Sequence, residues 1–357
     1  MKLTIWGGAG EHGRACFLVE AGGLKVLLDC GVINGKTKHY PLFDPELIRQ
    51  LDAVFISHLH DDHFGALPGL AVAWGRSGHA PGAVWLLLSC ETKTILYTGD
   101  WSPHSALLRH DPIPGNPLLA GRPIDLALAD CAYGTVETHW ENAFLRLTAT
   151  IAKVLAAGGT VLLPLPRLGR GQDLMVLLRE AFPEAELAVE ADLYQGLREA
   201  AANSELLRPE SAARIDRALA ANLIVVSEER EREQAAQGRR IVLTTDSRLE
   251  SAAARSYLRR LGGDPRHGLI ITGHLEKELL PAILFAGGSR LRMKVYRRRF
   301  PIHQGISDLR ALLNAVRIGR TLPVHAAQKQ TDRVCRRLAS EGYPGLISLS
   351  PGQSLEV

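Results

Sequence analysis

Apolar and polar positions alternate in short runs through the first hundred residues, a pattern typical of β-strands with one buried face. Gly-rich turns separate these runs. The strands that the pattern predicts are 3–6, 15–20, 25–28, 53–57, 84–89 and 94–98. We therefore expect the chain to begin with β-sheets arranged as a sandwich.

The pattern changes near residue 141, where helical periods begin to alternate with apolar strands. Helices are predicted over 141–157 and 171–181, and strands over 160–163 and 186–190. This alternation predicts a parallel α/β domain. The densely charged segment 228–240 is expected to be an exposed helix or loop with a plain solvated surface. Further predicted elements are strands 223–226, 241–244 and 268–272, a helical stretch through 286, strand 292–296, helix 307–316 and strand 321–324.

Composition and length are those of a globular chain with more than one lobe. At 357 residues the chain exceeds the size at which one hydrophobic core keeps growing, and 46% of its residues are hydrophobic against 22% charged. A net charge of +4 is too small to identify a polyanionic partner by itself. No apolar run reaches eighteen residues and no signal-peptide core is visible, so we expect a cytoplasmic protein without a membrane partner. The five cysteines are widely spaced, which favours buried thiols over disulfides.

A dense group of metal-binding residue types follows the strand predicted to end at residue 57. His58, His60, Asp62 and His63 lie within six residues. Alternate residues at a strand end project to the same side, so His58 and His60 can present two imidazoles to one ion. Asp62 and His63 then face a second ion. Such a group is hard to explain by chance.

Two later segments supply further candidate ligands. His79 lies in a Gly/Pro turn before a strand, and Asp100 follows the strand that ends in Tyr97-Thr98-Gly99. Each signal alone is weak, because histidines and aspartates are common in turns. Together with the histidine group they have a recognisable order along the chain.

That order resembles a known superfamily. The motifs His58-x-His60-x-Asp62-His63, Gly78-His79-x-Pro81-Gly82 and Thr98-Gly99-Asp100 are similar to the metal motifs of the metallo-β-lactamase superfamily, and Asp29 matches its early aspartate. The rest resembles the β-CASP branch, which includes RNase J-type nucleases and the endonuclease of messenger-RNA cleavage. The segments that carry this second likeness are Asp130-Cys-Ala-Tyr133-Gly134, 163–174, 268–273, Phe300-Pro-Ile-His303 and Leu322-Pro-Val-His325.

The resemblance implies a fold and a domain organisation. It implies an α/β protein in which a metallo-β-lactamase αββα sandwich carries an inserted parallel α/β (β-CASP) domain. Residues 1–140 would form the first part of the sandwich lobe, 141–288 the insert, and 289–357 the second part of the lobe.

The resemblance also implies a role for each matching residue. One ion would be held by His58, His60 and His79, and the other by Asp62, His63 and His325, with Asp100 bridging and Asp29 supporting the ligands. His303, oriented by Asp130, would protonate the leaving group or stabilise the phosphate. Asp62 would be catalytic as well as a metal ligand. Nitrogen and carboxylate ligands suit two zinc ions, with manganese as the alternative. A water that bridges the ions would lose a proton near neutral pH and attack phosphorus.

The activity so implied is cleavage of single-stranded RNA, with single-stranded DNA as a possible substrate. His325 resembles the histidine that RNA-acting members of the branch have in the corresponding motif. Arginines near the motifs are expected to contact phosphates. They are Arg167, Arg170, Arg297, Arg298 and Arg299.

Two alternatives stay open because the chain departs from the family pattern. Only fifteen residues separate His63 from His79, so the first lobe is shortened, and the segments 244–249 and 274–277 replace loops that the family places beside its site. A reshaped site would also suit hydrolysis of a small phosphodiester, ester or thioester. The second alternative is a non-catalytic scaffold of an RNA-processing complex, and the intact set of candidate ligands argues against it.

Overall fold

The computed structural model describes the chain apart from residues 34–38, 59, 68–69, 91, 120, 138, 222, 247 and 274–290. The chain divides into two compact units. The first unit is Met1–Ala73 with Leu87–Thr94, and the second is Trp74–Leu86 with Ile95–Val357. The helix expected to extend through residue 286 and the predicted boundary at 288 lie outside the described residues, so the division into 1–140, 141–288 and 289–357 stays a prediction.

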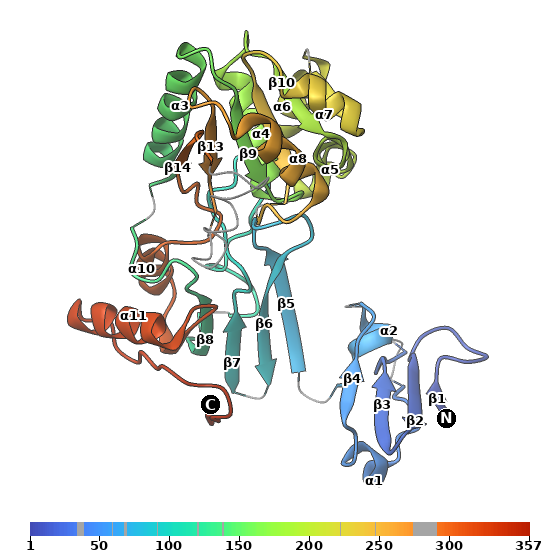
Figure 1. Cartoon of the computed structure of the whole chain (residues 1–357). Helices are drawn as coiled ribbons and strands as arrows, with labels where there is room; N and C mark the ends of the chain where they lie inside the picture. The colour runs from blue at the N-terminus through green and yellow to red at the C-terminus, as the bar shows by residue number, and fades with distance from the viewer. Residues whose placement is uncertain are drawn as a thin grey trace. The chain divides into compact units, whose positions relative to one another are not determined.

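The first unit is built on a four-stranded sheet of order β1-β2-β3-β4 (Figure 1). Its strands are β1 (Lys2–Gly7), β2 (Cys16–Ala21), β3 (Leu24–Leu28) and β4 (Ala53–Phe55), and its short helices are α1 (Pro45–Ile48) and α2 (Asp61–Phe64). The pairs β1/β2 and β2/β3 are antiparallel and β3/β4 is parallel. Trp6, Leu18 and Leu27 form part of a small buried core. The four strands predicted here are thus confirmed.

A five-stranded sheet has the order β15-β8-β7-β6-β5. Its strands are β5 (Leu70–Arg76), β6 (Val84–Cys90), β7 (Lys93–Tyr97), β8 (Ile124–Asp130) and β15 (Ile318–Val324). The sequence pattern predicted β6, β7 and β15 but not β5 or β8. The helices α10 (Ile306–Ala315) and α11 (Gln328–Ser340) share a buried cluster with the end of β8. Strands β7, β8 and β15 run parallel, so their carboxyl ends meet at one edge.

A six-stranded parallel sheet of order β11-β10-β12-β9-β13-β14 follows β8 in the chain and precedes β15. Its strands are β9 (Val161–Leu165), β10 (Leu187–Glu190), β11 (Leu223–Val226), β12 (Ile241–Thr245), β13 (Gly268–Ile271) and β14 (Lys294–Arg297). The accompanying helices are α3 (Trp140–Ala156), α4 (Arg170–Ala181), α5 (Ala191–Ala201), η1 (Ser204–Leu206), α6 (Ser211–Ala220), α7 (Glu229–Ala235) and α8 (Ala252–Leu261). This arrangement confirms the predicted inserted parallel α/β domain.

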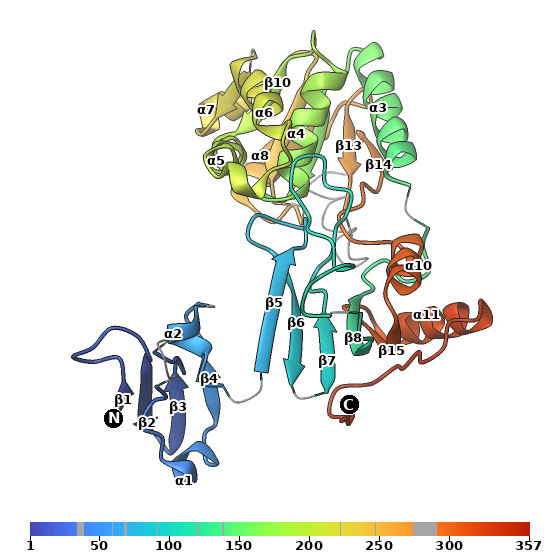
Figure 2. The same ribbon diagram turned by 180° about the vertical axis from the view of Figure 1, so that it is seen from behind.

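Both faces of this sheet are covered, as Figures 1 and 2 show. Leu163 and Leu243 belong to a core formed with α3, α4, α5 and α6, whereas their chain neighbours Leu162 and Val242 belong to a second core formed with α7 and α8. Successive strand residues point to opposite faces, so continuous apolar runs are what a doubly covered parallel sheet requires.

Two expectations about exposure need correction. Part of the segment 228–240 is not plain solvated surface: Ala235 is buried, and the Arg232 guanidinium donates to both Glu190 carboxylate oxygens at 3.0 and 2.8 Å. A helix against a sheet must bury one stripe, and α7 does so. Cys16, Cys30 and Cys131 are buried free thiols as expected, but Cys90 is exposed. In the described part of the chain, no helix has the length and apolar character needed to cross a membrane.

Candidate metal centre

The backbone of the first histidine group is held in place by three hydrogen bonds within the first unit. The amides of Ala15 and Cys30 donate to the carbonyls of Asp62 and His63 at 2.8 and 2.6 Å, and that of Val32 donates to the carbonyl of Asp61 at 2.9 Å. A Cβ atom at Gly31 would lie 1.6 Å from the Asp62 carbonyl oxygen, so this approach requires glycine. The loop after β3 therefore positions α2.

The donor atoms of this group form two close pairs. His58 Nε2 lies 3.1 Å from His60 Nδ1, and His63 Nε2 lies 3.6 Å from the Asp62 carboxylate. Histidine and carboxylate donor atoms lie about 2.0–2.2 Å from a zinc ion. Two donors that bind the same ion are therefore separated by distances close to the 3.1 and 3.6 Å found here. The sequence predicted that His58 and His60 bind one ion and that Asp62 and His63 face a second, and this assignment stays a prediction.

Asp29 supports this group from the end of β3. One carboxylate oxygen accepts from the Ser57 amide at 2.6 Å, and the other accepts from the Ser57 hydroxyl and His63 Nδ1, each at 2.8 Å. Burial opposes ionisation, but these hydrogen bonds outweigh it and the pKa of Asp29 lies below its usual value. Because His63 uses Nδ1 for Asp29, its Nε2 stays available to a metal ion.

A second cluster lies at the shared strand edge of the second unit. Nitrogen or oxygen atoms of Asp100, Asp130, His303 and His325 all lie within 4.8 Å of one another. Asp130 ends β8, His325 follows β15, Asp100 follows β7 and His303 follows β14. The parallel strands β7, β8 and β15 thus bring together residues that are far apart in sequence.

Asp130 is fully buried and both of its oxygens are already engaged. One accepts from the Ala132 amide at 3.0 Å, and the other accepts from the Trp101 amide at 3.0 Å and from His303 Nδ1 at 2.8 Å. Burial works against ionisation, yet the hydrogen bonds from His303 and the two amides keep the pKa of Asp130 below its usual value. A carboxylate so occupied is better suited to orient His303 than to bind an ion.

Asp100 and His325 of this cluster, together with the neighbouring His79, are the side chains that can hold a metal ion. The Asp100 carboxylate lies 3.5 Å from His79 Nε2 and 3.0 Å from His325 Nδ1. His79 Nδ1 lies 3.0 Å from the Ile302 carbonyl, to which it can donate, and this leaves Nε2 facing Asp100. Burial lowers the pKa of His79, which favours the neutral, ligating imidazole.

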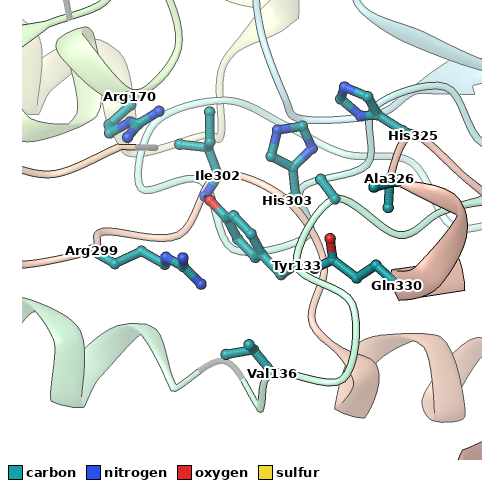
Figure 3. Close-up of a pocket in the computed structure, with 11 residues that line it drawn as sticks. Tyr133, Val136, Arg170, Arg299, Ile302, His303, His325, Ala326 and Gln330 are labelled. Atoms are coloured by element: carbon teal, nitrogen blue, oxygen red, sulfur yellow. The ribbon is translucent and has the colours of Figure 1, made fainter. Parts of the chain in front are cut away.

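A cavity of about 570 Å³ opens beside His303 in the second unit (Figure 3). Two of the five predicted phosphate-binding arginines line it, Arg170 and Arg299. The other three do not: Arg167 pairs with Glu199 at 2.9 Å, Arg298 donates to Thr150 at 2.6 Å, and Arg297 is exposed on β14. The complete lining is Ala132, Tyr133, Val136, Arg170, Arg299, Ile302, His303, His325, Ala326, Ala327 and Gln330.

Sequence reasoning did not single out three residues of these sites. Ser57 precedes the first histidine and contacts Asp29, a position that its place at the strand end could have indicated. Tyr133 lies in the motif that begins at Asp130, and its hydroxyl accepts from the Ile302 amide at 3.0 Å. Gln330 carries no sequence signal, because only the packing of α11 brings it to the cavity.

Comparisons with known proteins agree with this arrangement. A model described as "Metallo-beta-lactamase superfamily" matches residues 9–76. The chain is 24% identical over 436 residues to the "Probable RNase MJ4" of Methanocaldococcus jannaschii, with 100% of both chains covered. It is 26% identical over 244 residues to "Ribonuclease TTHA0252" of Thermus thermophilus, covering 50% of this chain and 54% of that protein.

A third relative is "Cleavage and polyadenylation specificity factor 73" of Drosophila melanogaster, which is 23% identical over 430 residues. The alignment covers 96% of this chain and 62% of that protein, so the chain spans only part of the length of the second and third relatives. The family match falls on the first histidine group, and two of these relatives match over almost all of this chain. The chain is therefore similar to the metallo-β-lactamase superfamily over residues 9–76 and to ribonuclease and messenger-RNA processing relatives over almost its whole length.

Proposed function

We propose that the protein is a two-metal-dependent hydrolase that cleaves phosphodiester bonds of single-stranded RNA. One observation carries the proposal: in both clusters, histidine nitrogens and carboxylate oxygens lie 3.0–3.6 Å apart, as donors to a shared ion do. His63 and His79 each use their other ring nitrogen within the chain. The ribonuclease names of two relatives support RNA as the substrate.

Within each unit, the types and spacing of the donor atoms suit a divalent cation. The family resemblance assigns one ion to His58, His60 and His79 and the other to Asp62, His63 and His325, with Asp100 bridging, and we adopt this assignment as part of the proposal. The donor set is nitrogen and carboxylate, which suits zinc, with manganese as the alternative. Divalent ions bound at such sites supply an activated water and neutralise charge at phosphorus.

His303 is the group of the chain best placed to act on the leaving oxygen. Asp130 holds its Nδ1 at 2.8 Å, which fixes the ring and leaves Nε2 free to carry a proton. The ring packs between those of His79 and His325, with centroid distances of 4.6 and 5.1 Å. We infer that His303 donates a proton to the leaving oxygen or a hydrogen bond to the phosphate.

The experiment measures metal content and RNA cleavage together. The purified protein should contain about two equivalents of zinc or manganese by mass spectrometry and should cut a 5′-labelled single-stranded RNA. His60→Ala should lose both properties. His139→Ala should lose neither, because His139 is exposed and its side chain makes no cap hydrogen bond to α3.

Other outcomes would favour the alternatives. If metal is bound and RNA and DNA stay intact while bis-p-nitrophenyl phosphate or a thioester is hydrolysed, the protein is a hydrolase of small substrates. If no metal binds even after supplementation, a scaffold role replaces catalysis. The ladder of RNA products separates endonuclease from exonuclease action.

A further inference from the structure

The solvent-facing side of α11 carries a row of basic residues, here called the basic stripe. Lys329, Arg333 and Arg336 are exposed and follow one another at spacings of four and three residues, which places them on one face of a helix. Arg337 is exposed on the same face, one turn after Arg333. The buried residues of the helix, on its opposite side, are Thr331, Val334 and Leu338. The side of α11 that faces water is therefore almost entirely basic.

The described part of the chain neutralises little of this charge. Of the four stripe residues, only Arg337 has a carboxylate partner among the described residues, and that partner is Glu341. The same carboxylate also accepts from Arg310, so it is shared between two guanidinium groups. Asp332 is the one acidic residue in the sequence of α11, and its carboxylate accepts from the Ser348 hydroxyl at 2.7 Å. Three positive charges of the stripe are thus available to a partner.

A helix face with one sign of charge needs a reason. Exposed helices usually mix both signs, as α6 and α7 do, where Arg214 binds Glu180 and Arg232 binds Glu190 through pairs of contacts at 2.8–3.0 Å. Like charges spaced by four residues destabilise a helix. A row of unpaired basic residues therefore lowers the stability of the free chain and fits a surface that binds a polyanion.

The stripe begins beside the cavity that His303 and His325 line. Gln330 lines this cavity, and Arg333 and Arg337 follow it at three and seven residues, on adjoining positions of the helix surface. Because α11 has 13 residues and rises about 1.5 Å per residue, its carboxyl end lies about 20 Å from the end that borders the cavity. Figures 1 and 2 both show α11 beside α10 at the periphery of the second unit.

We propose that the basic stripe of α11 binds the phosphates of single-stranded RNA outside the active site and guides long strands to the cavity. The inference rests on the proposed function, because it names where the part of the RNA that is not cleaved is held. Lysine and arginine at phosphates displace counterions without reading the bases, so binding depends on salt and on strand length and not on sequence. Long RNAs should therefore be preferred over short ones.

The salt dependence of RNA binding tests the stripe. Fluorescence anisotropy measures binding of single-stranded RNAs of about 5 and about 25 nucleotides to full-length His60→Ala, which should leave them uncut. Lys329→Gln, Arg333→Gln and Arg336→Gln are combined in this background, since glutamine is a good helix former. For the long RNA, affinity should fall roughly 10-fold, and the slope of log K against log salt should become less steep by about 2, because each phosphate contact on a single strand contributes about 0.7. The short RNA should keep its slope.

Cleavage gives a second measurement with His60 intact. The triple substitution should raise KM for the long RNA roughly 10-fold and leave kcat unchanged, because the stripe binds the strand away from the reacting phosphate. Cleavage of the short RNA should not change. A lower kcat for both RNAs would show that α11 acts on the active site itself, and the proposal would be wrong.

A control with the same change in charge separates the stripe from the overall charge of the protein. Arg217→Gln, Arg255→Gln and Arg259→Gln replace exposed residues on α6 and α8, which cover opposite faces of the six-stranded sheet. This variant should keep the slope of the unchanged chain. An unchanged slope in the stripe variant, or an equal decrease in the control, would overturn the proposal and leave the proposed function standing. Stripe-dependent binding of RNA that the unchanged chain does not cleave would contradict the proposed function alone.

Discussion

The two clusters of candidate ligands are built in different ways. In the first unit, His58, His60, Asp62 and His63 come from one stretch of six residues, and His58 and His60 are exposed. In the second unit, Asp100, Asp130, His303 and His325 come from four separate segments, and the carboxylate of Asp130 is fully buried. The first cluster is thus local in sequence, whereas the second exists only because parallel strands end at a common edge.

The carboxylates of Asp29 and Asp130, which support the two clusters, also differ in burial and in their hydrogen bonds. Asp29 is 8% exposed and depends on Ser57 and His63 for its hydrogen bonds, whereas Asp130 is 0% exposed and also accepts from two backbone amides. A buried acceptor that loses its charge leaves donors unsatisfied in a medium where water cannot replace it. We therefore expect changes at Asp130 to have larger effects than changes at Asp29.

The largest effect is expected for Asp130→Asn. The substitution removes the negative charge that holds His303. The amide nitrogen of asparagine also cannot accept a hydrogen bond as the second carboxylate oxygen does, so kcat/KM for RNA cleavage should fall by about 10²- to 10⁴-fold. The metal content should stay near that of the unchanged chain, because the oxygens of Asp130 are occupied by His303 and by amides. The limb of the pH–rate profile that reports the acid should also shift. Loss of metal from this variant would identify Asp130 as a ligand and contradict the positioning role.

An intermediate effect is expected for Asp29→Asn. Replacing a carboxylate that orients a ligating histidine typically lowers metal affinity about 10- to 100-fold, and the same should hold for His63 here. Competition with a chromophoric chelator measures this affinity. Asp44→Asn is the matched control, since Asp44 caps α1 of the same unit through the amides of Glu46 and Leu47 and touches no candidate ligand. Equal metal affinity in the two variants would remove Asp29 from the site.

The smallest effect is expected for Ser57→Ala. The substitution removes the hydroxyl that donates to Asp29 at 2.8 Å but keeps the amide that donates at 2.6 Å. One hydrogen bond is worth about 0.5–1.5 kcal/mol, so metal affinity should fall about 2- to 10-fold. Ser57→Thr keeps the hydroxyl and should restore the affinity. A loss as large as that of Asp29→Asn would show that Ser57 has a more direct part in binding.

Much of the secondary structure was predictable, because it depends on local periodicity. The alternation of helical periods with the apolar runs of β9 and β10 indicated a parallel α/β domain, and the structure contains one. Strand β8 was missed, since Asp125 interrupts its apolar run and Asp130 ends it, although both faces of the strand are largely buried. Burial of a strand comes from its neighbours in the sheet, and a sequence pattern reports those only indirectly.

The sequence by itself determined the first histidine group and the residue types of the second, because ligand chemistry and strand-end spacing are local properties. The tertiary structure decided which groups are partnered. It gave His79 a carbonyl 223 residues away and made Asp130 a saturated acceptor. It also separated five similar arginines: two are bound within the protein, two line a cavity, and Arg297 is exposed. Hydrogen-bond partners and burial arise from contacts between distant segments, so only the folded chain shows which of these side chains are already engaged.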